Sequence, residues 1–168
     1  LVANQIVLRG EAKTKQWLKG MIGNVSQPYF PGDIGVIRAV ANKKCGIGIV
    51  NHYYVARMLA GVNGSKDKRL SKKVTVLTPS PAHVNVSAGG LAKYAENKEE
   101  AITLLEYLAS PKGSKGLAGP TFEHPLVGFN NSEEVTQFGK FEPDSVTINQ
   151  LGKFNQKAIK LMAEAGWD

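Results

Sequence analysis

The sequence predicts an α/β protein. Short apolar runs of the kind that form strands alternate with segments in which apolar residues recur at helical spacing. The chain has 168 residues, which is enough for one domain or for two small lobes. No internal repeat, low-complexity stretch or long linker interrupts the pattern. The short strands between helices favour an open sheet.

The first part of the chain is expected to form a helix–strand–helix unit. A helix over residues 11–25 precedes a proline-containing break, and Asp33 suits the N-cap of a second, short helix. Residues 45–50 are an apolar run with two glycines, which predicts a buried strand that another backbone approaches closely. Asn51 then caps a helix from His52 to about Ala60.

The second part begins with a basic segment, residues 64–73, which is expected to be a loop. Strands are expected at residues 74–77 and 84–87, and a helix from about Lys98 to Ala109, which Ser110-Pro111 ends. Residues 119–145 contain three prolines and are expected to be irregular. A last helix from about Ile148 to Ala165 is expected to stop at Gly166.

Composition excludes several classes of protein. No apolar run approaches the roughly 20 residues that a membrane-spanning helix needs. The single cysteine, Cys45, excludes an internal disulfide and a cysteine-rich zinc site. Lys and Arg number 21 against 14 Asp and Glu, a net charge of +7 that allows an acidic partner without requiring one. The basic segment lacks interleaved aromatic residues, so no nucleic-acid partner is expected.

A pair of tyrosines occupies the position where the predicted strand gives way to a helix. Ligands of open α/β sheets collect at this end of the strands. At a helix start, Tyr53 and Tyr54 can turn their oxygens toward one point, and phenolate oxygens suit hard, highly charged cations. The positive end of the helix dipole favours the negative charge. Arg57 is placed to reach back to either oxygen, and Asn51 lies at the same turn.

The dipeptide alone leaves a second interpretation open. Paired tyrosines on a helix are more commonly core or rim aromatics than metal ligands. A free phenol has a pKa near 10, so neither tyrosine binds metal at neutral pH unless the metal displaces its proton.

The run Cys45-Gly-Ile-Gly-Ile-Val-Asn-His-Tyr-Tyr54, followed by Val55-Ala-Arg57, resembles the segment around the tyrosine pair of bacterial ferric-ion-binding proteins. These are the substrate-binding components of iron(III) ABC importers. The resemblance continues in the same order through His83-Val-Asn-Val-Ser87, residues 93–108, Ser110-Pro111 and residues 159–167. It therefore covers nearly the whole chain.

The resemblance implies the C-terminal half of a periplasmic-binding-protein-like (type II) two-lobed fold. Residues 1–83 would form the main part of the C-terminal lobe. Residues 84–134 would cross the hinge to the N-terminal lobe, and residues 135–168 would return with the closing helix.

The resemblance also implies a function. The protein would be a non-enzymatic periplasmic protein, or a surface lipoprotein, that captures Fe(3+) or a ferric chelate and delivers it to an ABC permease. Tyr53 and Tyr54 would be the metal ligands, and Asn51 and Arg57 would contact a bound anion or the ligands. The remaining ligands would come from the upstream half of the same protein.

Other chemistry-bearing residues are expected to have structural roles. Cys45 lies in the apolar run, where a free cysteine is usually a small buried residue. The side chain of His52 should point away from the tyrosines, and an exposed or capping role is expected. His83 opens a predicted strand, and His124 lies in a loop bounded by prolines.

Two other functions remain open. The chain could be a solute-binding lobe for a small organic anion or a polyamine, which would bind its ligand without metal. It could also be the effector-sensing domain of a transcription regulator, with a DNA-binding module upstream. No paired carboxylates, phosphate-binding loop or nucleophile elbow supports an enzyme.

Overall fold

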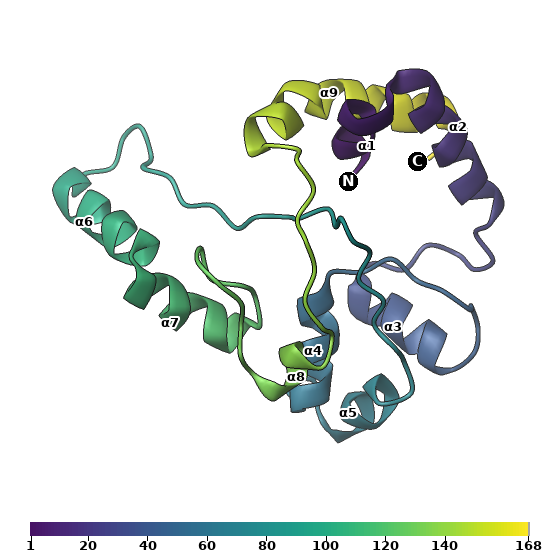
Figure 1. Cartoon of the computed structure of the whole chain (residues 1–168), viewed down its shortest axis with the longest axis horizontal. Helices are drawn as coiled ribbons and strands as arrows, with labels where there is room; N and C mark the ends of the chain where they lie inside the picture. The colour runs from purple at the N-terminus through teal and green to yellow at the C-terminus, as the bar shows by residue number, and fades with distance from the viewer. Residues whose placement is uncertain (168) are drawn as a thin grey trace. The chain divides into compact units, whose positions relative to one another are not determined.

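The computed structural model describes residues Leu1–Trp167, and within them the regular secondary structure is almost entirely helical (Figure 1). The helices are α1 (Val2–Arg9), α2 (Glu11–Gly23), α3 (Asp33–Ala41), α4 (His52–Ala60), α5 (Ser65–Ser71), α6 (Lys98–Ala109), α7 (Pro111–Thr121), α8 (Glu133–Thr136) and α9 (Ile148–Ala165). In this described range the extended backbone pairs only in an isolated parallel bridge between Ala82 and Pro143. The α/β prediction is therefore confirmed in its helices and not in its strands.

The chain divides into two compact units. The terminal unit contains residues Leu1–Pro28, Pro79–Asn85 and Phe141–Asp168, and the central unit contains Tyr29–Thr78 and Val86–Lys140. These boundaries differ from those of the lobes expected for a complete two-lobed protein. The lobe assignment itself stays a prediction.

The terminal unit is built on helices from both ends of the chain. In Figure 1, α1 and α2 lie against α9. Their shared core contains Ile6 of α1, Leu18 of α2 and Leu161 of α9. Helix α9 has the expected bounds, with a capping box at Thr147 and a left-handed Gly166 at its end. Helix α2 ends two residues before the predicted end, and no sequence pattern predicts α1.

The central unit has a separate core, formed by Ile37 of α3 with Val55 and Met58 of α4. Helices α4 and α6 have the bounds expected from the sequence. The predicted N-cap of α3 is wrong by one residue, because Gly32 occupies the cap and Asp33 is already helical. The carboxylate of Asp33 is consequently available for a contact outside its own helix.

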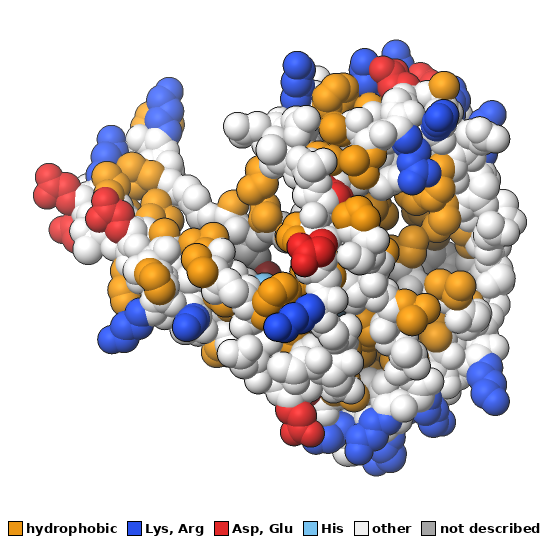
Figure 2. Space-filling model, viewed as in Figure 1, with side chains coloured by type: hydrophobic (Ala, Val, Ile, Leu, Met, Phe, Trp, Pro, Cys, Tyr) orange, Lys and Arg blue, Asp and Glu red, His pale blue; other side chains and the backbone are white. Residues whose placement is uncertain are grey.

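The predicted loop over residues 64–73 is wrong, because most of it forms helix α5. The basic side chains face solvent, and Figure 2 shows Lys and Arg side chains gathered over this helix. The acidic side chain of Asp67 points inward, where Arg38 of α3 donates two hydrogen bonds to it at 2.9 and 2.7 Å. The ion pair of the buried Asp67 with the partly exposed Arg38 and the contact of Leu70 with the core hold the helix against the central unit.

We expect Arg38→Met to destabilise the protein by about 2 kcal/mol, because it leaves the buried carboxylate of Asp67 without its partner. The Arg38 contact lowers the pKa of Asp67 from its ordinary value of 3.8. A lowered pKa contributes stability at neutral pH and loses it as the pH falls through the lowered value. Denaturant unfolding at several pH values tests this. The difference from wild type should be full at neutral pH and fade in acid, whereas the exposed-site control Arg69→Met should stay within about 0.5 kcal/mol of wild type.

The three expected strands are extended segments without strand partners. The expected strand over residues 45–50 forms no backbone–backbone hydrogen bond. In the one over residues 74–77 only Val74 forms such a bond, a turn bond to the carbonyl oxygen of Ser71, and Ile47 and Leu77 are 85% and 83% exposed. Val50, Val74 and Val76 nevertheless pack on the core of the central unit. The apolar pattern is thus that of strands, but the described residues supply no neighbouring strand to complete a ladder.

The segment expected to be irregular, residues 119–145, contains the last turn of α7 and the short helix α8. Ser110 ends α6 as expected and caps α7 in turn, since its hydroxyl accepts a hydrogen bond from the backbone of Gly113 at 3.1 Å. None of the described helices is both long and apolar enough to cross a membrane.

Candidate functional site

The tyrosine pair lies in the first turn of α4. Val55, Ala56 and Met58 are buried on the inner side of this helix. Their burial fixes the rotation of α4 about its axis and leaves Tyr53 and Tyr54 half-buried beside its N-terminus. The helix N-terminus carries unpaired backbone N–H groups and a partial positive charge, both of which favour negative charge on the phenol oxygens.

The two phenol rings lie against each other. Their centroids are 4.3 Å apart and their planes are inclined by 33°. A hydrogen bond with Tyr54 is the largest of the effects that raise the pKa of Tyr53 to about 12, followed by burial and by the charges of Tyr54, Asp33 and Glu123. Tyr53 is therefore protonated at neutral pH in the metal-free protein, and a cation that binds its oxygen must displace the proton.

Asn51 occupies the N-cap of α4, as expected, but its side chain does not cap the helix. Its backbone N–H and its side-chain Nδ2 both donate to Oδ2 of Asp33, at 2.8 and 2.9 Å. The two bonds connect the start of α3 to the start of α4. Asp33 thereby fixes the turn that presents the tyrosines, a role that the sequence pattern does not reveal.

Arg57 lies one turn after the tyrosines, in the last turn of α4, and is half-buried. Within residues 1–167, no hydrogen bond or ion pair joins its guanidinium to either phenol oxygen. The expected contact between Arg57 and a phenolate oxygen therefore stays a prediction for the metal-bound state.

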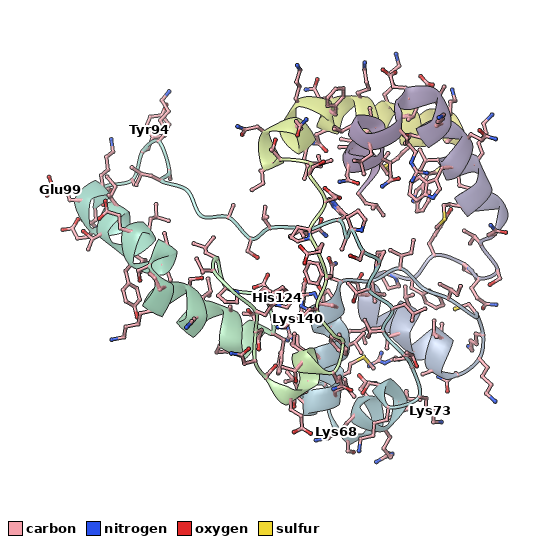
Figure 3. All side chains as sticks on the ribbon, viewed as in Figure 1. Lys68, Lys73, Tyr94, Glu99, His124 and Lys140 are labelled. Carbon is pink, nitrogen blue, oxygen red and sulfur yellow. The ribbon has the colours of Figure 1, made fainter. Side chains whose placement is uncertain are left out.

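His52 is neither an exposed nor a capping residue. Its Nε2–H donates to the carbonyl oxygen of Phe122 at 3.0 Å, and its ring stacks on that of His124 with centroids 4.8 Å apart. Figure 3 shows His124 beside the start of α4, in the loop that follows α7. Burial is the main cause that lowers the pKa of both histidines, so both are neutral at pH 7.

The other two candidates lie elsewhere. His83 belongs to the terminal unit and interacts with Asn85 through Nε2 and the side-chain oxygen at 3.0 Å. Cys45 is half-buried in an extended segment. Among the described residues no cluster of three or more His, Cys, Asp or Glu side chains could hold a metal ion.

The structure adds a loop to the site that sequence reasoning missed. Phe122 and His124 contact His52 at the N-terminus of α4 across some seventy positions of sequence, and Glu123 lies between them in the chain. Phe122 adopts the left-handed conformation, with φ 62°, at the end of α7. No sequence spacing connects this loop to the tyrosines, since they come together only in the folded central unit.

The chain is similar to known iron-binding and iron uptake proteins. It is 34% identical to iron uptake protein A1 of Synechocystis sp., over 99% of this chain and 48% of that protein. A solved Trichodesmium protein in complex with iron and citrate ligands is 37% identical and has a TM-score of 0.90, over all of this chain and 54% of that one.

A Bordetella ferric binding protein is 31% identical, with a TM-score of 0.88, and this chain covers 55% of it. No family model matches the chain. The resemblance expected from the sequence is thus confirmed over the whole chain, which spans about half the length of the relatives that it matches. This chain is therefore similar, over its whole length, to about half of each of these iron uptake and ferric binding proteins.

Proposed function

We propose that this chain is the C-terminal half of a protein that captures ferric ion through phenolate oxygens and delivers it to an ABC permease. The observation that carries the proposal is the contact between the rings of Tyr53 and Tyr54 at the N-terminus of α4. The Synechocystis relative named for iron uptake and the Trichodesmium structure with iron and citrate support iron as the cargo.

Both tyrosines would bind iron as phenolates. Each phenol loses its proton as the metal–oxygen bond forms, and two such charges compensate part of the trivalent charge. The bonds from Asn51 to Asp33 would hold the turn in place during binding. Asn51 is also the nearest candidate contact for an anion that completes the metal's coordination.

Arg57 would donate to a phenolate oxygen once the metal has removed its proton. We expect Arg57→Leu to weaken ferric binding by about tenfold. This is the lower end of the loss of metal affinity that follows when a group hydrogen-bonded to a metal ligand is removed. Arg57→Lys should recover part of the loss. Competition with citrate across a range of pH checks this: an Arg57→Leu variant with wild-type affinity and an unaltered pH dependence would exclude the role.

The remaining ligands would come from the upstream half of the relatives' fold. The start of α4 offers two phenols, and the described residues contain no three-residue cluster of His, Cys, Asp and Glu, whereas ferric ion prefers six donors. The exposed, unpaired segments around Ile47 and Leu77 fit the same proposal, because strands from the upstream half of the relatives' fold would complete their ladders. The full site would thus lie between two halves of one protein.

We infer a periplasmic or surface-lipoprotein location and a transport role without catalysis, by similarity to the ferric-binding relatives. Release would follow from opening of the lobes, reduction of the iron, or acid. Each of these weakens the bonds between phenolates and a trivalent ion.

Retention of iron tests the proposal. The longest natural form of the protein that contains this chain is equilibrated with ferric citrate, passed through a desalting column and analysed for bound metal. We expect one iron per protein. Binding of organic anions or polyamines without retained iron would contradict the proposal and favour the alternative of a metal-free solute-binding lobe.

A further inference from the structure

The loop Phe122–His124, hereafter the 122–124 loop, is held against the tyrosine-bearing helix from one side. The Nε2–H of His52 donates to the Phe122 carbonyl, and the rings of His52 and His124 stack. The left-handed backbone of Phe122 is a conformation that bulky residues rarely adopt, and it turns the chain out of α7 at this point. The loop thus has a defined position beside His52, which precedes Tyr53 in the chain.

Asn130 also forms hydrogen bonds with the 122–124 loop. Only 7% of this residue is exposed, and its Nδ2 donates to the carbonyl oxygens of Ala118 and Glu123 at 3.0 and 2.9 Å. Its backbone N–H donates to Nδ1 of His124 at 3.1 Å. These bonds fix the backbone of Glu123 between two anchored neighbours.

The carboxylate of Glu123 is oriented by two hydroxyl groups. Oε1 accepts a hydrogen bond from Ser87 Oγ at 2.6 Å, and Oε2 accepts one from Thr121 Oγ1 at 2.8 Å. Within residues 1–167 no lysine or arginine forms an ion pair with this carboxylate. A half-buried negative charge therefore stands beside the site without a cation to neutralise it.

The residues on either side of Glu123 both contact His52, which precedes Tyr53 in the chain. Phe122 does so through its carbonyl oxygen, at 3.0 Å, and His124 through its stacked ring. The ring of His52 in turn lies edge-on to that of Tyr53, with centroids 6.2 Å apart. Asp33, the carboxylate bonded at the start of α4, already accepts two hydrogen bonds from Asn51.

We propose that the 122–124 loop is part of the cation site, and that Glu123 supplies a fixed negative charge that draws ferric ion to Tyr53 and Tyr54. The inference rests on the proposed function. Two phenolates leave one positive charge of a ferric ion uncompensated, and one carboxylate balances it. Because electrostatic energy scales with the product of the charges, a trivalent ion gains three times as much from Glu123 as a monovalent ion does. The same carboxylate repels an anionic ligand.

Glu123→Gln tests the proposal, because glutamine keeps the shape and can still hydrogen bond with Ser87 and Thr121 while removing the charge. We expect ferric affinity, measured by competition with citrate, to fall about tenfold at low salt. The loss should shrink at high salt, because ions screen a charge and do not restore a damaged fold. Glu123→Asp, which keeps the charge, should bind more tightly than Glu123→Gln.

Glu99 of α6, an exposed carboxylate of the same unit, provides the control, and Glu99→Gln should bind iron as wild type does (Figure 3). Thr121→Val keeps the charge of Glu123 and removes one of the two hydroxyl groups that orient its carboxylate. We expect this variant to lose ferric affinity as well, but less than Glu123→Gln does. It replaces Glu123→Gln as the test if that variant does not fold. Wild-type affinity in Glu123→Gln, or a loss that salt does not change, would overturn the inference. Failure of the wild-type protein itself to bind iron would instead overturn the proposed function.

Discussion

Replacing Tyr53 or Tyr54 by phenylalanine should weaken ferric binding by more than about 100-fold, without unfolding the protein. Each substitution removes one anionic oxygen from the metal and leaves the ring that packs in the pair. Loss of groups that merely support a metal ligand already costs about 10- to 100-fold, so loss of a ligand costs more. Competition with citrate measures the affinity, and thermal unfolding without metal monitors the fold.

Tyr94→Phe is the matched control for this prediction. Tyr94 belongs to the same unit, is 83% exposed and is labelled far from α4 in Figure 3. Removal of the Tyr94 hydroxyl group should leave ferric affinity within a factor of two of wild type, as expected for an exposed side chain outside the site. Near-wild-type affinity in both Tyr53→Phe and Tyr54→Phe would return the pair to a packing role.

Ferric affinity should rise steeply with pH, because a phenol that becomes a metal ligand must give up its proton to the solvent. The pKa of Tyr53 is raised to about 12, so the whole neutral range lies below it. Release of two protons per iron predicts an increase of up to about 100-fold in the intrinsic binding constant for each pH unit. Acid should therefore release the metal.

The proton count can be measured by titrating iron into weakly buffered protein and following the pH, after correction for protons released by the chelator. In Tyr53→Phe the count should fall by one. The neutral histidines beside the site add to the effect only in acid, since burial lowers the pKa of His52 and His124. Iron binding that releases no protons would exclude phenolate ligands.

The sequence predicts the helices well wherever periodicity and caps agree. Helices α4, α6 and α9 begin and end where expected, because a helix satisfies its own backbone and needs no distant partner. The predicted strands do not form a sheet in the described residues, for the opposite reason. Residues 46–50 and 75–78 have the apolar pattern, but a ladder requires a second strand, and the pattern does not say which residues supply it.

The charge pattern of residues 64–73 also leads to a wrong prediction of secondary structure, because a single acidic residue faces the core there. Five basic residues suggest a solvated loop over residues 64–73, yet the inward-facing Asp67 and its partner Arg38 fix a helix there. At the site, the tyrosine pair is evident from the sequence because its members are adjacent. Asp33 and Glu123 are not, because their relation to Tyr53 arises only from the packing of α3 and the loop after α7 on α4.

The visible absorption spectrum during titration with ferric citrate tests the central claim most directly. Phenolate bound to Fe(3+) gives a charge-transfer band that neither ferric citrate nor a free phenol produces. The longest natural form of the protein should develop this band in proportion to bound iron, and the variant with both Tyr53→Phe and Tyr54→Phe should lose the contribution of these two residues. A wild-type protein that binds iron without such a band, or a double variant with the full wild-type band, would contradict the assignment of Tyr53 and Tyr54 as ligands.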